Sequence, residues 1–61
     1  MSKRLKRLRT EKAMSQAALA QRAGLTREYV NKLEAGKQDP SLTTITALAK
    51  ALGVPVPALL E

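Results

Sequence analysis

The sequence predicts an all-α fold, a compact domain of five short helices in which the second and third form a helix-turn-helix. Apolar residues recur at helical spacing through residues 16–35 and again through residues 42–52. Gly24 divides residues 16–35 into two helical patterns. Serine or threonine residues suited to capping precede the second, third and fourth helices. The chain has 61 residues, enough for one domain only, and we expect residues 1–61 to form it.

The first expected helix lies in the basic segment SKRLKRLRTEK, residues 2–12. Ser2 is expected to cap its start, and Leu5 and Leu8 define a narrow apolar stripe. A run of charges away from such a stripe is usually a solvated face, although contact with a phosphate backbone is the alternative. The basic residues in question are Lys3, Lys6 and Arg7.

Arg9 flanks the apolar stripe of the first helix, and Glu34 flanks the corresponding stripe of the third. We therefore predict an ion pair between Arg9 and Glu34. If the pair is partly buried, desolvation offsets most of the attraction between the two charges. The pair would then fix the angle between the helices more than it would stabilise the fold.

Ser15 is expected to cap the second helix, and Gly24 to provide the sharp turn that follows it. Ala20 is small, as required where two helices cross closely beside a short turn. The first turn has no acidic residue, so the free amides and the positive end of the helix stay unneutralised. With the side-chain amide of Gln16, this end is a candidate phosphate site.

Thr26 is the expected N-cap of the third helix, in which Val30 and Leu33 point inward one turn apart. At about 100° per residue, a wholly polar face lies opposite them, with Tyr29 on its border. The residues of this polar face are Arg27, Glu28, Asn31 and Lys32.

Gly36 is suited to end the third helix, and Ser41 to cap a fourth from Leu42 to about Leu52. The predicted core stripe of this helix comprises Leu42, Ile45, Leu48, Ala49 and Leu52. Its start, with Ser41, Thr43 and the nearby Lys37, is a second candidate phosphate site.

Gly53 ends the fourth helix, and Pro57 suits the first position of a short fifth helix. The C-terminal segment is strongly apolar, and its four large apolar residues either cap the core or form an isologous dimer contact. These residues are Val54, Val56, Leu59 and Leu60.

Composition excludes several function classes. The chain has no cysteine and no histidine, and its five carboxylates are scattered, so no catalytic pair or metal cluster is visible. We expect neither enzymatic activity nor a metal or cofactor. There is no apolar run of membrane-spanning length and no signal-peptide pattern, which favours a soluble, cytoplasmic protein.

The net charge of +6 favours a polyanionic partner, because neutralising phosphates releases their counterions. A soluble scaffold with a solvated lysine face is the alternative. Tyr29 is the single aromatic residue, so the stacking platforms on which single-strand and RNA-binding sheets depend are absent.

From Leu5 to Leu60, the chain resembles the Xre/Cro-repressor-like helix-turn-helix family of five-helix, lambda-repressor-like DNA-binding domains. The resemblance rests together on the stretches RLKRLR, SQAALAQRAG, LTREYVNKLEAGK, PSLTTITALAKALGVP and PALL. It implies a transcriptional regulator, a dimeric repressor that binds double-stranded DNA at a palindromic operator, with the third helix in the major groove.

By position, the resemblance makes Gln16 a phosphate-contacting glutamine and Arg9 with Glu34 an interhelical ion pair. It places Arg27, Glu28 and Lys32 at base-contacting positions. The family often has a glycine where Ala13 stands and usually an acidic residue where Ala18 stands, so the end of the first helix is expected to be shaped differently here.

The chemistry of the polar face agrees with base contacts. Arg27 can bond both O6 and N7 of guanine, Glu28 can accept from a cytosine amino group, and Asn31 suits adenine. Lys32 reaches guanine or phosphate. The residues expected to contact phosphates are Gln16, Thr26, Tyr29, Lys37, Ser41 and Thr43.

The competing hypothesis is a protein-interaction module, antitoxin-like or adaptor, that holds a protein partner on the third helix or on the C-terminal apolar patch. An acidic or apolar third helix would favour it. The polar face here is basic to neutral, which favours DNA, although a DNA-binding antitoxin satisfies both hypotheses.

Overall fold

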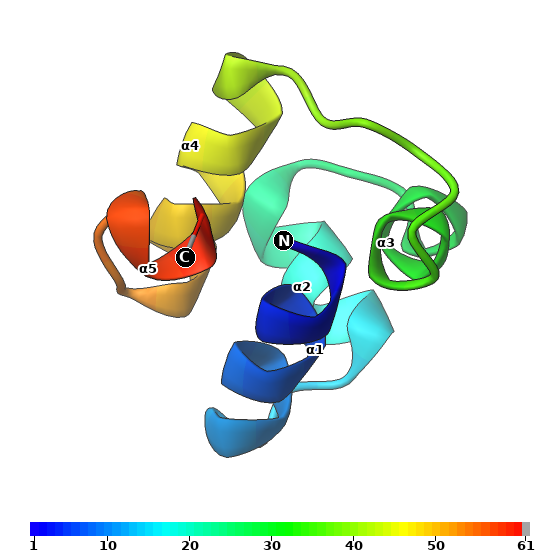
Figure 1. The fold of residues 1–61 in the computed structure, drawn as a ribbon. Coiled ribbons are helices and arrows are strands. Elements are labelled where there is room, and N and C mark those ends of the chain that lie inside the picture. Colours follow the sequence, from blue (N-terminus) through cyan, green and yellow to red (C-terminus); the bar gives the residue numbers. More distant parts are fainter. Residues whose placement is uncertain (61) are drawn as a thin grey trace.

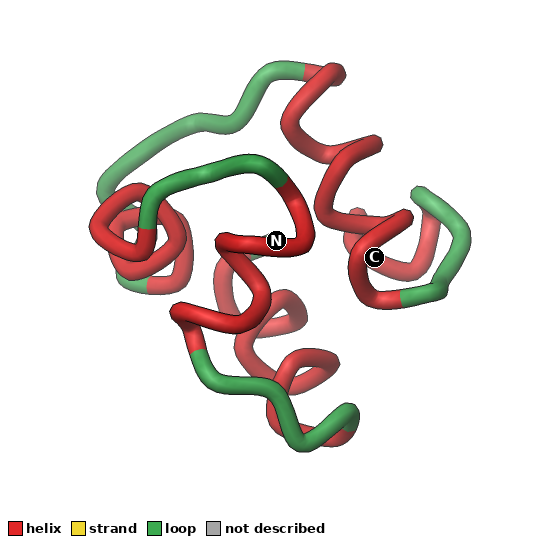
Figure 2. The backbone as a smooth tube through the Cα atoms, turned by 180° about the vertical axis from the view of Figure 1, so that it is seen from behind, coloured by secondary structure: helices red, strands yellow, loops and turns green. Residues whose placement is uncertain are grey.

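A computed structural model describes residues 1–60, so Glu61, the last residue of the expected domain, lies outside the described residues. The chain forms five helices: α1 (Ser2–Glu11), α2 (Gln16–Ala23), α3 (Arg27–Glu34), α4 (Leu42–Leu52) and α5 (Pro57–Leu60) (Figure 1). Figure 2 shows helices and loops only along the described part of the chain. The predicted all-α fold is therefore confirmed.

The helices surround a shared centre. In Figure 1, α1 lies in front of α2, α3 stands at the right-hand edge, and α4 and α5 lie on the left. Helix α2 packs against both α3 and α4, while α1 packs against α3 and α5. Helix α3 is therefore supported from its inner side by α1 and α2, and its outer side is left open.

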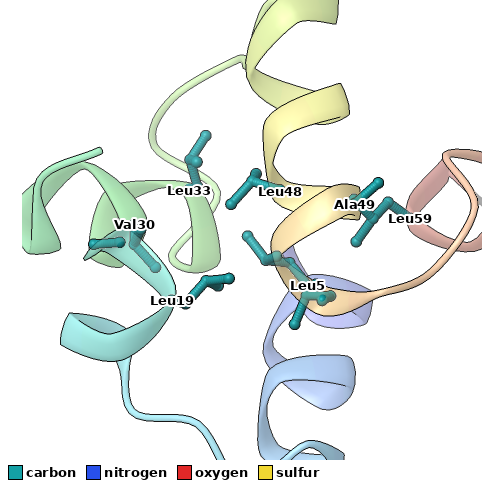
Figure 3. Packing of buried hydrophobic residues seen from close by; sticks show 9 residues of the cluster. Leu5, Leu19, Val30, Leu33, Leu48, Ala49 and Leu59 are labelled. Carbon is teal, nitrogen blue, oxygen red and sulfur yellow. The ribbon is translucent and has the colours of Figure 1, made fainter. Parts of the chain in front are cut away.

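The core is made of aliphatic side chains from all five helices (Figure 3). Burying each of the larger ones stabilises the fold by about 1.5–3 kcal/mol. Ala20 is 3% exposed, as expected for a small side chain where two helices cross closely. The core residues are Leu5, Leu19, Ala20, Val30, Leu33, Leu48, Ala49, Leu52 and Leu59.

Three of the four predicted caps are confirmed. The side-chain oxygens of Ser15, Thr26 and Ser41 accept backbone N–H bonds of 3.0, 3.1 and 3.2 Å at the starts of α2, α3 and α4. The prediction for Ser2 is wrong, because α1 begins at Ser2 itself and its start has no side-chain cap. Ser2 instead lies beside Gly36, in the loop after α3.

Helices α1 to α4 end alike, with a residue of positive φ followed by a backbone N–H that bonds a carbonyl five residues earlier. In three of them this residue is glycine. After α1 it is Ala13, at φ 56°. The expectation that the alanine would change the shape of this end is therefore wrong, because Ala13 adopts the same conformation as the glycines.

Two apolar residues lie elsewhere than predicted. Leu42 is 71% exposed, because it stands in the first turn of α4, beyond the edge of the core. Leu59 is 0% exposed and belongs to the core, so the core-capping alternative is confirmed for it and the dimer contact is wrong. Leu60 is 55% exposed, while Val54 and Val56 are half-buried against the core.

None of the helices within residues 1–60 is long and apolar enough to cross a membrane.

Candidate DNA-binding interface

Helix α3 separates its side chains by face. Val30 and Leu33 are 0% and 1% exposed, respectively, against the core. The four side chains of the predicted polar face are all exposed, and no other segment of residues 1–60 covers them: Arg27, Glu28, Asn31 and Lys32. The predicted display of this face is confirmed.

The predicted ion pair between Arg9 and Glu34 is confirmed. Nε of Arg9 donates to Oε2 of Glu34 at 2.6 Å, and Nη2 donates to Oε1 at 3.1 Å. The two side chains are only 13% and 4% exposed, respectively. The hydrogen bond to Glu34 raises the pKa of Arg9 above its ordinary value, burial opposes that rise, and the charge of Glu34 adds to it.

The third nitrogen of the Arg9 guanidinium holds the turn before α2. Nη1 donates to the carbonyl oxygen of Met14 at 2.7 Å, and the N–H of Met14 donates to the carbonyl oxygen of Arg9 at 3.1 Å. Both main-chain polar groups of Met14 are thus bonded to Arg9. One side chain therefore ties the start of α2 to the end of α3.

Gln16 is the part of the site that sequence reasoning described incompletely. Its Nε2 donates to Oε1 of Glu34 at 3.1 Å and to Oδ1 of Asn31 at 3.4 Å. Both amide hydrogens are thus engaged within the protein, and a phosphate must displace the longer bond to reach them. The sequence predicts only a phosphate contact for Gln16 and neither of these bonds to α3.

The residues that are candidates for contacting DNA phosphates flank α3. In Figure 1 the start of α2 lies below α3, and the loop leading to α4 leaves above it. The first turn of α2 has no acidic residue, so its free N–H groups stay unneutralised. Thr26 and Ser41 accept capping bonds through their hydroxyl oxygens, and the Ser41 hydroxyl also lies 3.0 Å from that of Thr44. Lys37 and Thr43 are exposed, and Tyr29 is half-buried on the border of the polar face.

Comparison with known proteins places this geometry in a family. A family model described as helix-turn-helix matches residues 5–59. The chain belongs to the helix-turn-helix family. The predicted Xre/Cro-repressor-like resemblance is thereby confirmed for almost the whole chain.

Helix-turn-helix regulators are among its relatives. The immunity repressor protein of Bacillus phage phi105 is 39% identical over 59 residues, which are 97% of this chain and 41% of that protein. This helix-turn-helix chain spans about half the length of the curated relatives it matches.

Two solved structures share the fold closely. The restriction-modification controller protein C.AhdI from Aeromonas hydrophila has a TM-score of 0.94 at 43% identity, over 95% of this chain and 88% of that one. The biofilm regulator SinR, solved in complex with DNA, has a TM-score of 0.93 at 33% identity, over 98% and 97% of the two chains. These likenesses confirm the predicted lambda-repressor-like type of five-helix domain.

Proposed function

We propose that this chain binds double-stranded DNA sequence-specifically, with α3 lying in the major groove. It is proposed to act as a cytoplasmic transcriptional repressor. The observation that carries the proposal is the solvent-facing polar side of α3, whose inner side is fixed to the core by Val30 and Leu33. Family membership and the DNA complex of SinR support it. An α-helix fits the major groove, where the base edges are distinguishable.

The proposed base contacts come from the four exposed residues of α3. Arg27 bonds O6 and N7 of a guanine, and Glu28 accepts from a cytosine amino group. Asn31 contacts adenine. Lys32 reaches a guanine or the adjoining phosphate.

The proposed phosphate contacts lie on both sides of α3 and set its register in the groove. On one side stand the N–H groups at the start of α2 and the amide of Gln16, which gives up its bond to Asn31 when a phosphate binds. The other proposed phosphate ligands are Thr26, Tyr29, Lys37, Ser41 and Thr43.

A two-fold dimer is the proposed binding form, because two half-sites give so small a domain useful affinity on a palindromic operator. The apolar residues left for the contact are Val54, Val56 and Leu60. Leu60 is the most exposed of them at 55%. Leu59 is excluded by its complete burial.

Selection of binding sites from random duplexes tests these assignments. The parent chain is expected to select a motif with two half-sites about one helical turn apart. Arg27→Ala is expected to lose preference at one base pair per half-site, at a cost of about 1–3 kcal/mol. Parent chain that selects no motif would contradict the proposed function, and an unchanged motif for Arg27→Ala would contradict the role of that arginine.

Gln16→Ala is the matched control. It is expected to weaken binding to all selected duplexes by a similar factor, because phosphate contacts carry no sequence information.

A further inference from the structure

Glu28 is the one acidic side chain of the polar face of α3, and it is exposed in the first turn of that helix. The other two helical carboxylates among residues 1–60, those of Glu11 and Glu34, each pair with an arginine. Over the same residues, Glu28 forms no ion pair. Its carboxylate is therefore available to accept hydrogen bonds from a bound partner.

A carboxylate in a DNA interface is unfavourable unless it meets a hydrogen-bond donor, because phosphates repel it and an ionised carboxylate can only accept. The base edges in the major groove have two donors, the exocyclic amino groups at N4 of cytosine and N6 of adenine. Glu28 is the second residue of α3, and the N-terminal part of a recognition helix is the part that contacts base edges. Position and chemistry therefore both direct Glu28 to an exocyclic amino group.

Asn31 is the second residue of the polar face that needs such a group. Its contact with adenine pairs Oδ1 with the amino hydrogen at N6 and Nδ2 with N7. The bond of 3.4 Å that Oδ1 accepts from Gln16 in the free protein leaves this contact possible, because a carbonyl oxygen has two lone pairs. The contacts proposed for Arg27 and Lys32 use acceptors of guanine instead.

An exocyclic amino group of a paired base offers one hydrogen to the major groove, because its other hydrogen bonds the opposite base. Methylation of the amino nitrogen places the methyl group where the groove-facing hydrogen was. The donor is lost, and the acceptor oxygen on the protein is left against an apolar group. An unsatisfied acceptor in a desolvated interface costs binding free energy, and more so when it is charged.

We propose that methylation of base amino groups in the operator regulates this protein by lowering its affinity for DNA. The inference rests on the proposed function. Glu28 provides the response to methylation at N4 of cytosine, and Asn31 the response to methylation at N6 of adenine. Methylation at C5 of cytosine is not a signal of this kind, because it leaves the amino hydrogen in place.

The test uses the duplex that the parent chain selects, prepared in methylated and unmethylated forms. One form has N4-methylcytosine at the base pair whose preference Glu28→Ala loses, and another has N6-methyladenine at the base pair whose preference Asn31→Ala loses. Parent affinity is expected to fall about tenfold for each methylated form, which is the loss of one base contact. The matched control is 5-methylcytosine at the same cytosine, for which the expected change is under about threefold.

The two variants show whether methylation acts through the named side chains. Glu28→Ala has no acceptor to lose, so it is expected to bind the N4-methylated and unmethylated duplexes equally within about twofold, while it still discriminates against N6-methyladenine. Asn31→Ala is expected to show the reverse. Equal losses in the parent and in the matching variant would overturn the inference, because methylation would then act on the DNA itself.

Two other outcomes would also overturn the inference while leaving the proposed function intact. One is a parent chain that selects a motif but binds its methylated forms as tightly as the unmethylated one. The other is an unchanged motif for both Glu28→Ala and Asn31→Ala, because neither side chain would then contact a base. A parent chain that selects no motif would contradict the proposed function itself, so the two kinds of failure are distinguishable.

Discussion

The turns on the two sides of α2 reach the same backbone conformation by different means. The turn between α1 and α2 has Ala13 at φ 56°, and the turn between α2 and α3 has Gly24 at φ 72°. In each, the next residue donates its N–H to a carbonyl five residues back, Met14 to Arg9 at 3.1 Å and Leu25 to Ala20 at 2.8 Å. The difference lies in what holds the left-handed residue in place.

Glycine adopts positive φ at no steric cost, so the second turn is determined locally. Alanine pays a steric penalty there, and the first turn is held by the Arg9 side chain, which bonds the Met14 carbonyl and Glu34 together. A turn can therefore be fixed either by its own residue or by a tertiary contact. The turn between α1 and α2, which is held by a tertiary contact, is also linked through Arg9 to α3, because Glu34 belongs to that helix.

Arg9→Ala is expected to have the largest effect on stability. It removes the hydrogen bond that holds the first turn and leaves the carboxylate of Glu34, 4% exposed, without its cation. We expect a loss of about 3 kcal/mol in the free energy of unfolding, measured by urea denaturation followed by helical circular dichroism. Arg7→Ala, which breaks an exposed pair on the same helix, is expected to cost under about 0.5 kcal/mol. Equal losses for the two variants would contradict the role of Arg9 in holding the first turn.

Gly24→Ala tests the locally determined turn. No atom lies within 4 Å of an added Cβ, so the cost is only the penalty of positive φ, about 1 kcal/mol. Gly53→Ala, at φ 70° and equally open, is the matched control and is expected to lose the same amount. A loss of several kcal/mol at Gly24 alone would show that this turn, too, depends on its surroundings.

Ala13→Gly has the smallest expected effect, and its sign is opposite. Glycine removes the penalty of positive φ, and its greater freedom in the unfolded chain offsets part of the gain, leaving about 0.5 kcal/mol of added stability. Ala17→Gly, an exposed position inside α2, is expected to lose about 0.5–1 kcal/mol by the same measurement. Destabilisation by both substitutions would mean that Ala13 is not strained.

Much of the candidate site was predictable because it depends on local rules. The spacing of Val30 and Leu33 determines which side of α3 is buried, and hence which side chains are displayed. Thr26 sets the start of that helix through its cap. The pairing of Arg9 with Glu34 followed from the position of each beside an apolar stripe.

The five helices, the caps at Ser15, Thr26 and Ser41, and the composition of the polar face could be predicted from the sequence, because periodicity and capping act within a few residues. The bond from Gln16 to Asn31, the burial of Leu59 with the exposure of Leu42, and the positive φ of Ala13 became known only from the folded chain. Each of these outcomes depends on contacts between different helices. Side-chain periodicity within one helix carries no information on those contacts.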